Sequence, residues 1–147
     1  MILLQPERIG IKIATTDVAV SYSERGGAVI EVAALTVDGH VTDRRETFRV
    51  VFDVVAELRC ISLNFYESNH GEYEVLDVRA LDDLEASWRE TGCHPDPGLY
   101  QFEDLDEPNR RMDLYDPSGR LGLRSFLLVG NDSYVQVVAQ GYRIERV

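Results

Sequence analysis

The stretch TFRVVFDV, residues 47–54, carries the clearest secondary-structure signal in the chain. Apolar side chains stand at every second position, and polar side chains stand at most of the positions between them. Successive side chains of a strand point to opposite faces, so this alternation predicts a strand with one buried face. The apolar positions are Phe48, Val50, Phe52 and Val54.

Shorter runs of the same kind lie on both sides of this stretch. The run 28–37 has apolar residues on both of its faces, as in a central strand. Asp38 and Gly39 follow it and predict a type I′ hairpin turn, because that turn needs positive φ at both central residues. Together with 47–54, the expected strands are 9–14, 18–23, 28–37, 58–66, 73–80, 124–129 and 134–140.

The last two expected strands form a hairpin across the turn residues 130–133. Along the second strand, Val135 and Val137 share one face, whereas Tyr142 and Ile144 fall on the other parity. Gly141 lies where the parity changes. It is therefore the predicted position of a β-bulge that resets the register.

One segment has the periodicity of a helix. Leu81, Leu84 and Trp88 lie three and four positions apart, which places them on one helical stripe. Acidic residues at the start favour a helix N-terminus, and Gly92 suits the position just beyond a helix end. We expect a helix at 82–91, with Trp88 in the core.

Residues 93–118 show no regular pattern and contain four of the five prolines. A structureless segment of this length is unusual inside a compact domain. It carries Tyr100, Phe102 and Tyr115 among acidic residues. These rings are expected either to anchor the segment to the body of the protein or to line a recognition surface.

These elements predict a single domain, 1–147, of the α+β class. Its core is a mostly antiparallel, curved sheet of seven or eight strands with one principal helix at about 82–91. One helix covers only part of such a sheet, so the sheet must bend or the protein must form a homodimer. A β-barrel or sandwich with an accessory helix is the alternative.

The charge is concentrated in one part of the chain. Residues 67–116 hold 15 acidic residues against 4 arginines, while the other residues hold 11 acids and 11 bases, so the formal net charge of −11 belongs to this segment. Nucleic acid and anionic membranes are poor partners for such a surface, because phosphate binding needs clustered lysine and arginine. A basic protein is the better electrostatic match.

No motif for common chemistry is present. The chain lacks a P-loop, a dinucleotide-binding glycine pattern, a nucleophile elbow and a zinc-protease motif. Cys93, His94 and Asp96 are too close in sequence to converge on one ion, and no second pair completes a site, so no metal and no cofactor are expected. Cys60 is expected in the core, and Cys93 in an exposed loop.

The compartment is expected to be the cytoplasm. The first residues lack a basic and apolar leader, and no run is long enough to span a membrane. Two distant cysteines without a partner pattern favour reduced thiols.

Three functions remain open at this point. The leading one is a non-enzymatic, soluble interaction protein that uses its acidic surface, such as an inhibitor or immunity-type protein against a basic partner. The second is a small-molecule binding module with a pocket between sheet and helix, and the third is an enzyme with an unfamiliar site. The candidate partner-binding residues are Asp104, Asp106, Glu107, Tyr100, Phe102 and Tyr115.

Overall fold

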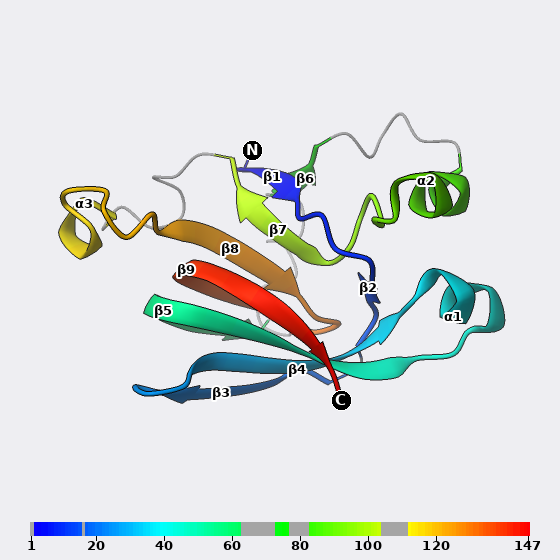
Figure 1. Cartoon of the computed structure of the whole chain (residues 1–147), viewed down its shortest axis with the longest axis horizontal. Coiled ribbons are helices and arrows are strands. Elements are labelled where there is room, and N and C mark those ends of the chain that lie inside the picture. The colour runs from blue at the N-terminus through cyan, green and yellow to red at the C-terminus, as the bar shows by residue number, and fades with distance from the viewer. Residues whose placement is uncertain (1, 16, 63–72, 77–82, 104–111) are drawn as a thin grey trace.

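The chain folds into one strongly curled sheet with short helices beside it (Figure 1). The computed structural model describes residues 2–15, 17–62, 73–76, 83–103 and 112–147. The elements are β1 (Ile2–Pro6), β2 (Lys12–Ile13), β3 (Ala19–Ser23), β4 (Gly27–Leu35), α1 (Val37–Thr42), β5 (Glu46–Ser62), β6 (Tyr73–Val75), α2 (Leu84–Thr91), β7 (Leu99–Phe102), α3 (Met112–Tyr115), β8 (Arg124–Val129) and β9 (Ser133–Arg146).

The strand order across the sheet is β2-β4-β5-β9-β8-β7-β1-β6, and β3 also pairs with β4. Neighbouring strands are antiparallel, apart from β1 and β6, which are parallel. The curl brings β2 to the start of β7, where the Ile13 N–H donates to the Pro97 carbonyl at 2.8 Å. The predicted α+β class with a curved antiparallel sheet is confirmed.

Alternate residues of the central strands fill the inside of the curl. In β8, Phe126 and Leu128 join the main cluster, whereas Leu127 joins a second cluster on the opposite face. The main cluster contains Ile9, Ile11, Ile13, Ala28, Ile30, Val32, Ala34, Phe48, Val50, Phe52, Leu99, Phe126, Leu128, Val135, Val137 and Ala139. The second cluster contains Leu4, Tyr100, Phe102, Leu127 and Tyr134. Within the stretch 47–54, the alternate side chains Phe48, Val50 and Phe52 therefore face this core.

A bend in β5 changes which side chains face the core. Val54 has a left-handed backbone (φ 54°) and is exposed, and the register with β9 shifts between Val55 and Glu57. Gly141 pairs with Asp53 in unbroken register. The bulge predicted at Gly141 is therefore wrong, since the extra residue lies in the partner strand. The core-facing side chains of β9 change from odd to even positions at this point because β5 and β9 bend together.

The hairpin turn predicted at Asp38 and Gly39 is also wrong, because both residues lie in the first turns of α1. The Thr36 hydroxyl accepts the Gly39 N–H at 3.1 Å and so caps the helix, and Asp43 ends it with φ 53°. The chain does reverse here, but over six helical residues instead of two. A Cβ on Gly39 would lie 2.5 Å from the Arg44 carbonyl oxygen, so close packing also favours glycine here.

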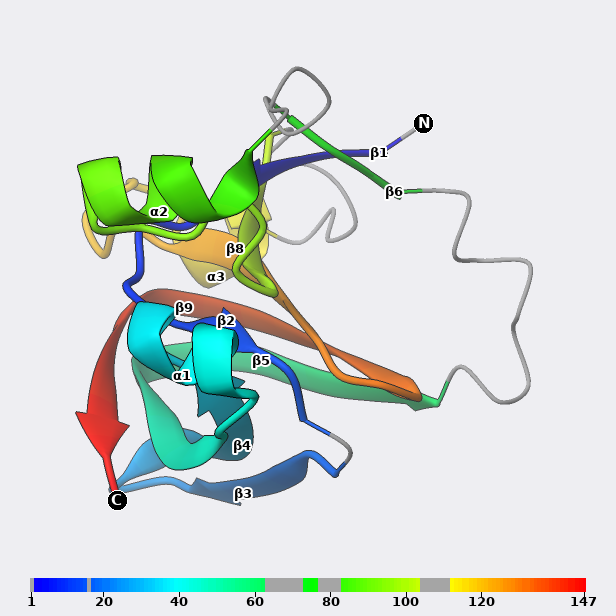
Figure 2. The same ribbon diagram turned by 90° about the vertical axis from the view of Figure 1, so that its right-hand side faces the viewer.

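The predicted helix is confirmed as α2. The Asp83 carboxylate accepts the Ala86 N–H at 3.0 Å as the N-cap, and Gly92 adopts φ 76° at the C-terminal end. Trp88 is 2% exposed and its indole N–H donates to the Gly10 carbonyl at 3.2 Å. Leu84 lies at the surface, so the described core contact of the stripe is made by Trp88. Figure 2 shows α2 beside α1, which it contacts.

The segment 93–118 is less irregular than predicted, because it contains β7 and α3. Strand β7 is only four residues long, but it lies between β1 and β8 and is largely buried. The sequence pattern does not predict strand β1 either. Both strands are too short to show a period by themselves.

The structure also bears on the two cysteines and on membrane-spanning helices. Cys60 is exposed on β5, so its placement in the core is wrong, and neither Cys60 nor Cys93 is in a disulfide. Within the described ranges, every helix is too short or too polar to cross a membrane.

Candidate functional site

A groove of about 670 Å³ lies between the segment 5–11 and the end of β9. It exists because β8 accompanies β9 only as far as the pair Arg124 and Ala139, whereas β5 continues along β9 to Arg146. In the described part of the chain, residues 140–146 of β9 therefore have a sheet partner on one side only. The lining residues are Gln5, Pro6, Glu7, Arg8, Ile9, Gly10, Ile11, Arg124, Tyr142, Arg143 and Ile144.

The segment 5–11 is held over this opening by bonds that point away from β9. The Glu7 N–H donates to the Leu99 carbonyl at 3.0 Å. The Ile9 carbonyl accepts the His94 N–H at 3.3 Å, again on the side of β7. The segment thus spans the mouth of the curled sheet without extending the ladder of β9.

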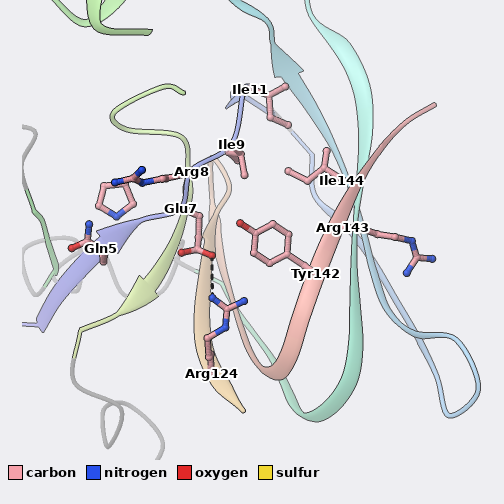
Figure 3. A pocket seen from close by; sticks show the side chains of 11 residues that line it. Gln5, Glu7, Arg8, Ile9, Ile11, Arg124, Tyr142, Arg143 and Ile144 are labelled. Atoms are coloured by element: carbon pink, nitrogen blue, oxygen red, sulfur yellow. Dashed lines mark ion pairs between the residues drawn. The ribbon is translucent and has the colours of Figure 1, made fainter. Parts of the chain in front are cut away.

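Three polar side chains converge at one end of the groove. Glu7, Arg124 and Tyr142 point toward one another, and a dashed line joins the ion pair (Figure 3). The Tyr142 hydroxyl faces the Glu7 carboxylate (Figure 3), and Arg124 Nη1 lies 3.8 Å from Glu7 Oε1. Burial raises the pKa of Tyr142, and the Glu7 charge raises it further, so this phenol remains a hydrogen-bond donor near neutral pH.

The remaining contacts of Arg124 set its orientation. Its guanidinium carbon lies 4.7 Å above the centre of the Phe126 ring, and Nη1 donates to Gln101 Oε1 at 3.2 Å. A guanidinium stacked on an aromatic ring gains a cation–π contact and loses little of its hydrogen-bonding capacity. Arg124 is therefore oriented by the fold before anything binds.

The other end of the groove is apolar. Ile9 and Ile11 are each 6% exposed and belong to the main cluster, and Ile144 packs against the same cluster. The ring of Tyr142 contacts the rings of Phe52 and Phe126, at centroid distances of 5.7 and 5.4 Å. The groove thus joins a short apolar wall to a charged and hydrogen-bonding end.

A second polar cluster lies around Asp96. Lys12 Nζ donates to the Asp96 carbonyl at 2.6 Å and lies 3.7 Å from its carboxylate. The Tyr100 hydroxyl donates to the same carboxylate. Burial is the main reason that the pKa of Tyr100 is raised, with the Asp96 charge second, so this phenol stays protonated near neutral pH. The sole lysine of the chain is thus engaged in holding the 94–98 loop against β2.

His94 is buried between this cluster and α2. Its Nδ1 accepts the Asp96 N–H at 2.8 Å, and its ring lies edge-on to Trp88 at 4.7 Å. Burial, followed by the positive charge of Lys12, lowers the pKa of His94 from 6.5 to about 4. The imidazole is therefore neutral at physiological pH and has a structural position.

The predicted aromatic site residues do not gather on one surface. Tyr100 and Phe102 are 4% and 1% exposed and lie in the second cluster, which fits the anchoring alternative. Tyr115 is half-buried on α3, and its hydroxyl donates to Glu57 Oε2 at 2.7 Å. Tyr115 thus ties α3 to β5.

The predicted acidic residues Asp104, Asp106 and Glu107 lie outside the described residues. The elements of the acidic segment that are described, β6, α2, β7 and α3, lie in the same half of the molecule in both views (Figures 1 and 2). Glu90 and Glu103 are exposed there and have no partner within the described ranges.

The acidic side chains on β4, β5 and β9 are matched by arginines. Arg49 lies 3.3 Å from Glu31, and Arg146 lies 3.2 Å from Glu46. Arg143 pairs with Asp53 at 3.1 Å. These cross-strand pairs leave little net charge on this part of the sheet.

A further cavity of about 330 Å³ lies between α2 and the segment 5–8. Ser87 and Thr91 of α2 line it, together with Cys93 and His94. No three histidine, cysteine or acidic side chains in the described residues are placed to hold a metal ion.

No spacing in the sequence marks Glu7, Arg124 and Tyr142 as a group. They come from the first connection, the start of β8 and the end of β9, and only the curl of the sheet brings them together. No protein-family model, curated protein or solved structure matches this chain.

Proposed function

We propose that this protein is a non-enzymatic interaction protein that binds a basic protein through the acidic surface of residues 67–116, in the manner of an inhibitor or immunity-type protein. The observation that supports the proposal is the uneven matching of charge. Acidic side chains on β4, β5 and β9 have arginine partners, whereas Glu90 and Glu103 on the acidic half have none among the described residues.

Acidic side chains without a basic partner, such as Glu90 and Glu103, act mainly on association. Its potential steers a basic partner into the correct encounter, and this effect weakens as salt screens the field. The screening length falls from about 30 Å at 0.01 M salt to about 10 Å at 0.1 M. The on-rate for the partner should therefore fall steeply over this range.

The experiment begins with capture of the partner from the source cell at low and high salt. Purified partner is then tested against the variant Asp104→Asn, Asp106→Asn, Glu107→Gln. This variant should slow association. On the proposal that these carboxylates face water, it should also leave the melting temperature nearly unchanged, because solvated carboxylates contribute little to stability.

The control removes the same charge from another part of the molecule. Asp17, Glu24 and Asp43 are exposed and lie outside the acidic segment. The variant Asp17→Asn, Glu24→Gln, Asp43→Asn should keep most of the on-rate. Equal effects of the two variants would reduce the proposal to a matter of total charge, and a partner indifferent to salt and to both variants would refute it.

Small-molecule binding is the second candidate, favoured by the cavity of about 330 Å³ between α2 and the segment 5–8. Ligand pockets commonly have volumes of about 300–1,000 Å³. Ser87 lines this cavity, whereas the neighbouring Ala86 is exposed. Thermal shifts produced by a metabolite library should disappear in Ser87→Trp and persist in Ala86→Trp. Shifts that survive in Ser87→Trp would exclude this cavity.

A further inference from the structure

The groove between the segment 5–11 and β9 carries the opposite charge balance from the whole protein. Three arginines line it, Arg8, Arg124 and Arg143, against the single acid Glu7, although the chain has a formal net charge of −11. The direction and the partners of each arginine decide which of them could meet an anion inside the groove.

Arg143 is not the residue that would bind such an anion. It points away from the groove (Figure 3) and is already paired with Asp53 at 3.1 Å and with Glu145 at 2.9 Å. The Arg8 side chain also extends away from Tyr142 (Figure 3). Arg124 is therefore the cation at the centre of the groove.

Arg124 has hydrogen-bonding capacity left over. Its guanidinium offers several N–H donors in a planar fork, and the one hydrogen bond described for it is from Nη1 to Gln101 at 3.2 Å. The Glu7 carboxylate forms an ion pair with Arg124, but at 3.8 Å it lies too far from Nη1 for a hydrogen bond.

The space beside the free edge of the guanidinium is kept open by Gly141. A Cβ built on Gly141 would have Arg124 Nη2 as its nearest neighbour, at 3.7 Å. A methyl group at this position would make only an ordinary contact with Nη2, whereas a longer side chain would occupy the approach to it. With glycine, an external group has room to reach the fork.

We propose that the groove binds a small organic monocarboxylate, with the carboxylate on the free N–H groups of Arg124 and the apolar body along Ile9, Ile11 and Ile144. A carboxylate matches the planar guanidinium fork in geometry and charge. A phosphate dianion would place excess negative charge close to Glu7. A fully apolar ligand would leave Arg124 without the interaction for which it is oriented. This site is separate from the acidic surface proposed above.

The test compares carboxylates with neutral amides of nearly the same shape. Hexanoate and phenylacetate are titrated into the full chain by calorimetry, beside hexanamide and phenylacetamide. The carboxylates should bind and the amides should not. Arg124→Met should weaken carboxylate binding by about tenfold or more, because a hydrogen-bonded ion pair is lost. Arg124→Lys should recover only part of the binding, because it keeps the charge and loses the fork.

A control variant and a blocking variant complete the design. Arg49→Met removes an arginine that pairs with Glu31 outside the groove, and it should bind as the parent does. Gly141→Asp supplies a carboxylate beside Nη2 from within the chain and should abolish binding, whereas Gly141→Ala should retain it. This pair keeps the test decisive if Arg124→Met folds poorly.

The proposal is overturned if the amides bind as well as the carboxylates, if no carboxylate binds, or if Arg124→Met and Gly141→Asp both bind like the parent. The acidic-surface variant at residues 104, 106 and 107 should leave carboxylate binding unchanged. Failure of one proposal is thereby separated from failure of the other.

Discussion

Protonation of His94 should destabilise the fold as the pH falls below neutrality. In the unfolded chain this imidazole takes up a proton near its ordinary pKa of 6.5, whereas burial holds the pKa in the folded protein at about 4. The unfolded state therefore binds more protons between these values. The stability that depends on neutral His94 is complete above about pH 6.5 and is lost as the pH falls toward about 4.

The size of the effect follows from the shift in pKa. One pKa unit corresponds to about 1.4 kcal/mol, so the full loss is about 3 kcal/mol, of which about 2 kcal/mol is reached by about pH 5. Measurements of stability should stop at about pH 5, because the isoelectric point of the protein is about 4.6. Loss of net charge near that point favours precipitation.

The assay is urea unfolding followed by Trp88 fluorescence at several pH values between about 5 and 8. The reference variant is His94→Asn, whose side-chain oxygen still accepts the Asp96 N–H but does not titrate. This variant should be less stable at pH 8, because it loses the ring contact with Trp88. Between pH 8 and pH 5, the unfolding free energy of the variant should nevertheless fall by about 2 kcal/mol less than that of the parent.

Parallel pH profiles for the parent and His94→Asn would refute the reasoning. They would mean that His94 titrates equally in the folded and unfolded chains. Its ring would then be solvated instead of buried against α2.

The remaining predictions are read from unfolding free energies. Trp88→Ala should cost about 3–5 kcal/mol, because a buried indole is replaced by a cavity; a variant that melts like the parent would mean that α2 does not cover the core. Gly39→Ala should destabilise by about 1–3 kcal/mol, since its Cβ would overlap the Arg44 carbonyl oxygen. A gain in stability, the usual result for glycine to alanine in a helix, would contradict this packing. Tyr115→Phe should cost about 1 kcal/mol through the hydrogen bond to Glu57, and no change would show that α3 is not held by this bond.

The sequence by itself determined the elements whose pattern is long enough to repeat. The alternation at 48, 50 and 52 predicts the buried face of β5, and the hairpin 124–140 appears as β8 and β9. The stripe containing Trp88, with Asp83 and Gly92 at its ends, predicts α2 to within two residues. In a strand and in a helix alike, the backbone period fixes the direction of each side chain. A local pattern of apolar residues therefore shows which face is buried.

The tertiary structure decided everything that depends on a distant partner. Asp38 and Gly39 favour a tight turn locally, but the Thr36 cap and the close approach of Arg44 place them in a helix. Strand β7 is too short to show a period, and it is a strand because β1 and β8 pair with it on both sides.

The candidate groove belongs wholly to this second category. Glu7, Arg124 and Tyr142 are far apart in the sequence, and each is unremarkable there. They meet because β8 leaves β9 at Ala139 and the segment 5–11 crosses the opening that results. Local patterns specify which face of a strand is buried. The point at which two strands part is set by the packing of the whole sheet, so the sequence alone could not reveal this site.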